Sequence, residues 1–185
     1  MQNEEKSSTT QTNPAWIRWL PFPVAGFVIL LDQFSKYIVE TNLPVYTYWA
    51  PIPALENLFR VTHTTNTGAA FGLFPAGSLF FAVMAVAVTA FIIYFNFTLE
   101  GNQTVLRIAL GLVLAGALGN FIDRVRLGHV TDFLDFGPWA IFNVADTAVV
   151  AGVIMMGWVM LQEERATKAK KKAANANEVT QNAGE

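Results

Sequence analysis

Four long apolar segments, separated by polar connections, dominate the pattern of this sequence. They cover residues 16–39, 79–97, 105–122 and 141–161. Each is close to the roughly 20 residues that an α-helix needs to cross the hydrocarbon core of a bilayer. We therefore predict a mainly α-helical integral membrane protein with four transmembrane helices, in which residues 16–162 form a single domain.

The two connections on one side of this predicted bundle contain stretches in which apolar and polar residues alternate. These outer connections are residues 40–78 and 123–140. Within them, residues 58–64 and 130–136 follow the two-residue period of a β-strand. We expect a small β-subdomain that rests on the outer end of the bundle.

Basic residues set the predicted orientation in the membrane. Five of them, between Arg165 and Lys172, directly follow the fourth apolar segment. Cytoplasmic flanks of transmembrane helices are enriched in lysine and arginine, so residues 163–185 are predicted to form a cytoplasmic C-terminal tail. Four crossings return the N-terminal tail, residues 1–15, to the same side. Both tails are polar, and we expect disorder over residues 1–12 and 166–185.

Composition supports the membrane class and removes several kinds of chemistry. The 185 residues are 53% hydrophobic and 14% charged, against about 25% charged in a typical soluble domain. The chain has no cysteine, which excludes disulfides, thiol nucleophiles and cysteine-ligated metals. It also lacks the His-Glu-x-x-His motif of zinc proteases and the Gly-x-Ser-x-Gly motif of serine hydrolases. His63 and His129 lack ligand spacing, and we expect them to be surface or packing residues.

Two aspartates lie at the membrane boundary around the last apolar segment. Asp132 precedes this segment and Asp146 lies inside it. A carboxylate at the centre of a membrane helix costs about 2.5–3.5 kcal/mol on insertion scales, which makes each a functional candidate. Two carboxylates within reach of each other are typical of a pair that shares a proton and activates water, as in aspartic proteases. Such a pair titrates as a unit.

Further polar residues gather at the same predicted depth. Asp32, Ser35 and Lys36 share one face of the first helix at i, i+3 and i+4. The others come from the remaining helix ends and the first outer loop: Asn66, Asn120, Asp123, Arg124 and Asn143. Because residues from all four helices and both outer loops converge there, we predict a polar site at the outer face.

Each of these residues also has a structural explanation. Asp32 and Lys36 fit an intrahelical ion pair, and Asn66 fits a turn. Asn143 fits a helix N-cap, with Asp146 interacting with the helix dipole in the first turn. A stripe of small residues, Gly111, Ala115 and Gly119, indicates close packing of the third helix against a neighbour.

Five ordered motifs connect the sequence to a known family. They are Asp32-Gln-Phe-Ser-Lys36, Asn66-Thr-Gly-Ala-Ala-Phe-Gly72, Gly119-Asn-Phe-Ile-Asp-Arg124, Gly128-His-Val-Thr-Asp132-Phe133 and Asn143-Val-Ala-Asp146. Over roughly residues 19–161, the chain resembles lipoprotein signal peptidase, also called signal peptidase II. The resemblance implies a bacterial inner-membrane aspartic endopeptidase with four transmembrane helices and a small periplasmic β-subdomain. Such an enzyme removes the signal peptide from a prolipoprotein, N-terminal to the diacylglyceryl-modified cysteine.

The resemblance also implies roles for particular residues. Asp132 and Asp146 correspond to the catalytic pair. Residues that bind substrate or support the site are Asn66, Asn120, Arg124 and Asn143, and further supporting residues are Asp32, Lys36, Gly68 and Asp123. No metal or organic cofactor is implied.

Partners and location follow from the same resemblance. Diacylglyceryl prolipoproteins are the expected substrates, membrane lipid surrounds the site, and cyclic peptide inhibitors such as globomycin are expected to bind. No nucleic-acid partner is implied. The expected location is the bacterial inner membrane, with several crossings, both termini in the cytoplasm and the active site on the periplasmic side.

Two other classes of function remain open from the residues alone. A small proton-coupled four-helix transporter would use Asp32 and Asp146 as a proton relay. The position of the polar residues at one face, rather than along a path to the other, argues against this interpretation. A non-catalytic membrane assembly factor would explain the small-residue stripe, but it leaves the paired aspartates unexplained.

Overall fold

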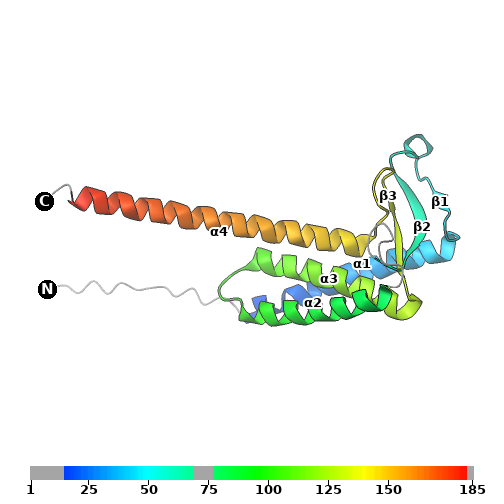
Figure 1. Cartoon of the computed structure of the whole chain (residues 1–185), viewed down its shortest axis with the longest axis horizontal. Helices are drawn as coiled ribbons and strands as arrows, with labels where there is room; N and C mark the ends of the chain where they lie inside the picture. The colour runs from blue at the N-terminus through cyan, green and yellow to red at the C-terminus, as the bar shows by residue number, and fades with distance from the viewer. Residues whose placement is uncertain (1–14, 69–76, 183–185) are drawn as a thin grey trace.

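The computed structural model describes residues 15–68 and 77–182, which form four long helices and one small sheet (Figure 1). The helices are α1 (Pro21–Asn42), α2 (Ser78–Thr98), α3 (Thr104–Leu127) and α4 (Val144–Asn182). A short 3-10 helix, η1 (Ala15–Trp19), precedes α1, and another, η2 (Pro53–Leu55), lies in the first outer connection. All four long helices include a stretch that is long and apolar enough to span a membrane. The predicted fold class is confirmed.

The sheet crosses one end of the bundle, roughly perpendicular to the helices (Figure 1). Its strands, β1 (Tyr48–Trp49), β2 (Arg60–Asn66) and β3 (Val130–Asp135), are antiparallel in the order β1-β2-β3. The first outer connection supplies β1 and β2, and the second supplies β3. The predicted β-subdomain is therefore confirmed, with both strand ranges shifted by up to two residues. β1 was not predicted, because two residues are too few for an alternating pattern to be visible.

Small residues let the other helices approach α3 closely. A Cβ atom on Gly111 would lie 2.8 Å from the carbonyl oxygen of Pro21, and one on Gly119 would lie 2.7 Å from Oδ2 of Asp32. Ala115, between them, is fully buried. The predicted close packing of this stripe is confirmed, and it brings α1 and α4 against α3 near the sheet.

An apolar layer separates the two ends of the bundle. Its buried members come from α1, α2 and α3: Ala25, Ile92, Leu110, Leu114 and Ala115. Burial of such side chains is favourable by roughly 25 cal/mol per Å² of apolar surface removed from water. The charged and amide side chains that the structure buries lie on either side of this layer.

The local sequence ends α3 where β3 must begin. Gly128 follows α3 with φ of 78°, and its N–H donates to the carbonyl of Arg124 at 3.1 Å. Glycine adopts this left-handed conformation without steric cost, which makes it a common helix terminator. The turn redirects the chain across the end of the bundle, so that β3 runs beside β2.

The prediction of disorder at the C-terminus is wrong over residues 166–182, because α4 continues to Asn182. Alanine and lysine in this segment are strong helix formers, and Lys168 Nζ pairs with Glu164 Oε1 at 2.5 Å in the i, i+4 position. Predicted disorder over residues 1–12 lies outside the described residues. Residues 69–72, which end the motif that begins at Asn66, also lie outside the described residues.

Candidate active site

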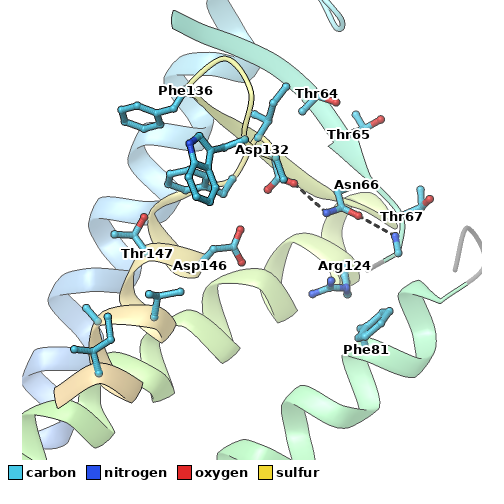
Figure 2. Close-up of a pocket in the computed structure, with 18 residues that line it drawn as sticks. Thr64, Thr65, Asn66, Thr67, Phe81, Arg124, Asp132, Phe136, Asp146 and Thr147 are labelled. Atoms are coloured by element: carbon cyan, nitrogen blue, oxygen red, sulfur yellow. Dashed lines mark hydrogen bonds between the residues drawn. The ribbon is translucent and has the colours of Figure 1, made fainter. Parts of the chain in front are cut away.

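Asp132 and Asp146 line the same cavity, whose volume is about 1150 Å³. Asp132 projects from β3, and Asp146 projects from the first turn of α4. Figure 2 shows both carboxylates directed into this cavity, with Asn66 beside Asp132 and Arg124 across from the two aspartates. Asp132 is only 3% exposed and Asp146 is half-buried. The structure therefore brings the two predicted aspartates together at the outer end of the bundle.

Two asparagine side chains hold Asp132. Asn66 Nδ2 donates to Oδ2 at 3.0 Å, and Asn143 Nδ2 donates to Oδ1 at 2.7 Å. Asn66 is itself oriented by the N–H of Gly68, which donates to its Oδ1 at 3.1 Å (Figure 2). The predicted turn at Asn66 and Gly68 thus positions a side chain that contacts the carboxylate.

Asp146 and Asn143 form a reciprocal cap at the start of α4. The N–H of Asp146 donates to Asn143 Oδ1 at 2.9 Å, and the N–H of Asn143 donates to Asp146 Oδ2 at 3.3 Å. This is the arrangement of a capping box. Asn120 Nδ2 donates to the other oxygen, Oδ1, at 2.8 Å. The predicted cap is therefore confirmed, and the same two residues lie beside the cavity.

Only neutral groups donate hydrogen bonds to these two carboxylates among the described residues, and neither carboxylate forms an ion pair there. Burial and the negative charge of Asp146 raise the pKa of Asp132, and the hydrogen bonds from Asn66 and Asn143 lower it; the net result is a pKa of about 7. Near neutral pH, Asp132 is therefore able to hold a proton.

A second pair of aspartates lies deeper in the same end of the bundle and shares a lysine. Lys36 Nζ lies 2.8 Å from Asp32 Oδ2 and 2.7 Å from Asp123 Oδ2. It also donates to Asn120 Oδ1 at 3.1 Å. All three charged side chains are fully buried, and the three ammonium hydrogens have three acceptors. The predicted pair between Asp32 and Lys36 is confirmed, with Asp123 as an additional partner.

This charged cluster holds the segments that carry the two cavity aspartates. Asp32 Oδ1 accepts a hydrogen bond at 2.9 Å from the N–H of Ala145, next to Asp146. Asp123 Oδ2 accepts one at 3.3 Å from the N–H of Thr131, next to Asp132. Asn120 links the two groups, because its amide oxygen contacts Lys36 and its amide nitrogen donates to Asp146.

Arg124 reaches the cavity without pairing with a carboxylate. Its Nη1 donates to the carbonyl of Asn120 at 3.3 Å, and its guanidinium lies 5.4 Å from the centre of the Phe81 ring. Within the described part of the chain, its Nε has no hydrogen-bond partner. Figure 2 shows the guanidinium opposite the aspartates, and Arg124 is among the residues that line the cavity.

Some predicted residues lie elsewhere. The hydroxyl of Ser35 donates to the carbonyl of Asp32 in its own helix at 2.8 Å. His63 is buried and contacts the carbonyl of Leu43 through Nδ1 at 2.7 Å, which confirms its packing role; His129 is half-buried. Asp135 is also buried, and Arg60 Nε donates to its Oδ2 at 2.6 Å.

Gln33 is a supporting residue that the sequence reasoning missed. Its Nε2 donates to Asp123 Oδ1 at 2.9 Å, and to Asp32 Oδ2 and the carbonyl of Gly119 at 3.2 Å each. Its Oε1 accepts from Arg126 Nη1 at 3.0 Å. The sequence did offer a clue, because Gln33 is a polar residue next to Asp32 inside an apolar helix. Such a residue is costly in a membrane unless its hydrogen bonds are satisfied.

Comparisons with known proteins show which family the chain resembles in sequence. Residues 24–162 match the family described as signal peptidase (SPase) II. A lipoprotein signal peptidase of Caldanaerobacter subterraneus subsp. tengcongensis is 42% identical over 75% of this chain and 93% of its own length. One from Enterococcus faecalis is 40% identical over 83% of this chain and 95% of its own length.

A solved structure of a bacterial membrane enzyme shares the fold of this chain. A bacterial membrane enzyme determined at 2.3 Å resolution is 32% identical, with a TM-score of 0.72, and covers 78% of this chain and 88% of that chain. The resemblance predicted from the five motifs is therefore confirmed. From the sequence match and the shared fold together, we conclude that the chain belongs to the signal peptidase II family.

Proposed function

We propose that Asp132 and Asp146 are the catalytic residues with which this signal peptidase cleaves prolipoproteins. As a member of its family, the protein is a membrane aspartic endopeptidase that removes signal peptides from prolipoproteins. The observation that carries the residue assignment is the pair of carboxylates directed into one cavity, each bound only by neutral donors among the described residues. Two such groups cannot both ionise cheaply, so one retains a proton.

The proposed reaction uses that shared proton. The ionised aspartate takes a proton from a water molecule held between the two carboxylates, and the water oxygen attacks the scissile carbonyl carbon. The protonated aspartate donates its proton to the carbonyl oxygen, giving a neutral tetrahedral diol. The aspartate that took the water proton then gives it to the peptide nitrogen, and the other aspartate takes back a proton from a diol hydroxyl. The C–N bond breaks, which releases the signal peptide with a C-terminal carboxyl group and the lipoprotein with a free amine. The raised pKa of Asp132 supports this scheme, because it keeps one proton on the pair near neutral pH.

The amide residues divide into two groups in this proposal. Asn143 is fully buried, and neither Asn120 nor Asn143 lines the cavity. We assign them to positioning the two aspartates. Asn66 and Arg124 do line the cavity, and we assign them to the substrate backbone. The free donors of Arg124 are suited to a peptide carbonyl oxygen.

The walls of the cavity fit a lipidated substrate. Beyond Asp146, the cavity continues along α4 past Val150 and Ile154, which are 58% and 66% exposed and face the region that lipid would occupy. We propose that the acyl chains of the diacylglyceryl group lie along this face while the peptide bond reaches the aspartates. Cyclic peptide inhibitors such as globomycin would occupy the same cavity.

We further propose that the cavity opens on the periplasmic side of the bacterial inner membrane, with both termini in the cytoplasm. The basic residues that follow the membrane-spanning part of α4 support this orientation. Because the chain has no cysteine, single cysteines can test it. A membrane-impermeant maleimide on intact spheroplasts should label Tyr46→Cys, in the exposed loop before β1, and leave Lys170→Cys unlabelled. The reverse pattern would overturn the orientation.

One experiment tests the catalytic assignment. The purified chain in detergent, given a diacylglyceryl-modified prolipoprotein, should release the signal peptide. Asp132→Asn and Asp146→Asn should each abolish release while the protein stays folded. The transporter alternative is not supported, because the apolar layer of α1, α2 and α3 lies between the polar site and the other end of the bundle. Release by either variant at the wild-type rate would exclude the proposed pair.

A further inference from the structure

A second polar cavity lies at the end of the bundle remote from the sheet. Its volume is about 280 Å³, and its walls come from η1, the end of α2 and the start of α3. The charged and amide groups around it are Arg18, Asn96, Glu100 and Arg107. The apolar layer separates this cavity from the peptidase site, and none of its residues belongs to that site.

Arg107 is buried in this cavity without a counter-charge. It is 4% exposed, and its Nη1 donates to the backbone and side-chain oxygens of Asn96 at 2.8 and 2.6 Å. Its Nη2 donates to the carbonyl of Leu99 at 2.9 Å. Over residues 15–68 and 77–182, it forms no ion pair, and its Nε has no hydrogen-bond partner. A buried cation with only neutral acceptors and an unused N–H is suited to an anion.

Arg18 brings a second guanidinium to the same cavity. The carbonyl of Arg18 accepts a hydrogen bond from Asn96 Nδ2 at 2.9 Å, which holds η1 against the end of α2. The side chain is exposed and has no ion pair in the described part of the chain. Glu100 is exposed at the rim and pairs with neither arginine. Two arginines against one glutamate leave the cavity positively charged.

Aromatic residues indicate the depth of this cavity in the membrane. Trp16 and Trp19, on either side of Arg18, are 62% and 58% exposed. The Trp19 ring lies 5.7 Å from Phe22 and 5.6 Å from Phe97. Exposed tryptophans of transmembrane proteins gather at the level of the lipid headgroups. The two guanidiniums are therefore at the depth where phospholipid phosphates lie.

We infer that this cavity binds the phosphate of an anionic phospholipid from the leaflet at this end of the bundle. Arg18 would contact the phosphate from the surface, and the positive charge of Arg107 in the cavity wall, which no described carboxylate pairs, would attract it from inside. Guanidinium groups bind phosphate oxygens through paired, charge-assisted hydrogen bonds. The lipid would join η1 to the connection between α2 and α3. The inference does not depend on the catalytic assignment.

Lipid retention by the intact protein tests this site. Native mass spectrometry of the full chain in detergent would measure the apparent affinity for phosphatidylglycerol and for phosphatidylcholine. We expect a preference for phosphatidylglycerol, reduced about fivefold in Arg18→Gln. The Arg18 side chain forms no hydrogen bond in the described part of the chain, so the variant should fold normally and cleave prolipoprotein at the wild-type rate in detergent.

Arg165→Gln is the matched control, because it removes the same charge from an exposed position on α4. It should leave the affinity for phosphatidylglycerol unchanged. Equal affinities of the wild type for the two lipids would overturn the inference, and so would equal losses in the two variants. Displacement of the lipid by low millimolar inorganic phosphate would show that the cavity takes the free anion instead, which also overturns it.

Discussion

Two pairs of aspartates occupy the same end of the bundle, and they differ in what lies between them. Asp32 and Asp123 share the ammonium group of Lys36 and are fully buried. Asp132 and Asp146 receive hydrogen bonds only from amide groups among the described residues, and they line a cavity. The first pair shares a cation inside the protein, whereas the second pair has no cation partner among the described residues and, in the proposed mechanism, binds a proton and a water molecule.

The presence or absence of a cation gives the two pairs different roles in one hydrogen-bond network. We assign the pair with Lys36 to supporting the site and the pair in the cavity to the reaction. A buried carboxylate that contacts a cation can also accept hydrogen bonds that hold neighbouring backbone N–H groups in place. The Lys36 cluster uses this property to hold the backbone N–H groups of Ala145 and Thr131, each adjacent to a cavity aspartate. A carboxylate without a cation has a pKa that moves toward neutrality, as that of Asp132 does. The charged pair therefore holds the backbone beside the two aspartates that we propose share a proton.

Removing a carboxylate from the cavity pair should have the largest effect. Asp132→Asn and Asp146→Asn each keep the shape and the amide hydrogen bonding of the site but cannot exchange the proton. We expect signal-peptide release to fall by roughly 10²–10⁴-fold or more, with little loss of thermal stability. Single-turnover cleavage of a diacylglyceryl prolipoprotein measures the rate. A variant that unfolds instead of losing chemistry would place that aspartate in the supporting group.

Removing the cation should instead act on stability. Lys36→Met leaves two buried carboxylates unpaired, which costs about 3–5 kcal/mol. Thermal unfolding in detergent measures this loss. The control is the triple variant Lys36→Met, Asp32→Asn, Asp123→Asn, which removes the buried charges together and should recover much of the stability. Equal stability of Lys36→Met and the wild type would contradict the difference between the two pairs.

The pH dependence of stability should distinguish Asp132 from Asp135. Burial raises the pKa of Asp132 from 3.8 to about 7, so the folded state binds an extra proton between these values. Stability should fall by roughly 1–3 kcal/mol as the pH rises from about 4 to 7, and Asp132→Asn should remove this slope. Cleavage should decline above about pH 7, as the pair loses its proton.

Asp135 supplies a control of opposite sign. Burial tends to raise its pKa, but hydrogen bonds from Arg60, Thr62 and Gly137 and the charge of Arg60 lower it overall. Its contribution to stability is present above the ordinary pKa of 3.8 and is lost as the pH falls through the lower folded value. Asp135→Asn should therefore lower stability at neutral pH and remove the part of the acidic loss of stability that Asp135 causes. A change in the slope between about pH 4 and 7 would contradict the assignment.

The smallest effect is expected in the sheet. Arg60 pairs with Asp135 at 2.6 Å and is one-third exposed, at 32%, so solvent screens the pair and Arg60→Gln should cost about 1 kcal/mol or less. Because Asp132 keeps its own hydrogen bonds, we expect a rise in KM with kcat nearly unchanged. Steady-state cleavage separates the two constants. A fall in kcat as large as that of Asp132→Asn would show that the sheet controls the chemistry directly.

Much of the fold was visible in the sequence because the bilayer allows few solutions. Apolar runs of about 20 residues must satisfy their backbone hydrogen bonds internally, and a helix does so. The predicted bounds of α2 differ from the observed bounds by one residue at each end. The C-terminal extension of α4 was missed because its polar composition resembled a disordered tail, although its alanines, lysines and i, i+4 pair favour a helix.

Only some contacts of the candidate site could be predicted from the sequence. The sequence indicated that Asp32 and Lys36 pair, because residues four apart on a helix are neighbours. It did not indicate that Asp123 joins them rather than pairing with the adjacent Arg124, or that Gln33 bridges the two carboxylates. These choices depend on how α1 rotates against α3, which local spacing does not specify.

The sequence by itself determined that four helices cross a membrane and that acidic and amide residues gather at one face. Only the tertiary structure decided which carboxylates received a cation. Close packing at Gly119 brings Asp32 and Lys36 of α1 against Asp123 of α3. The antiparallel pairing of β2 and β3 and the cap at Asn143 then direct Asp132 and Asp146 into the cavity. The charge on a carboxylate depends on neighbours brought from distant segments, and that is set by packing.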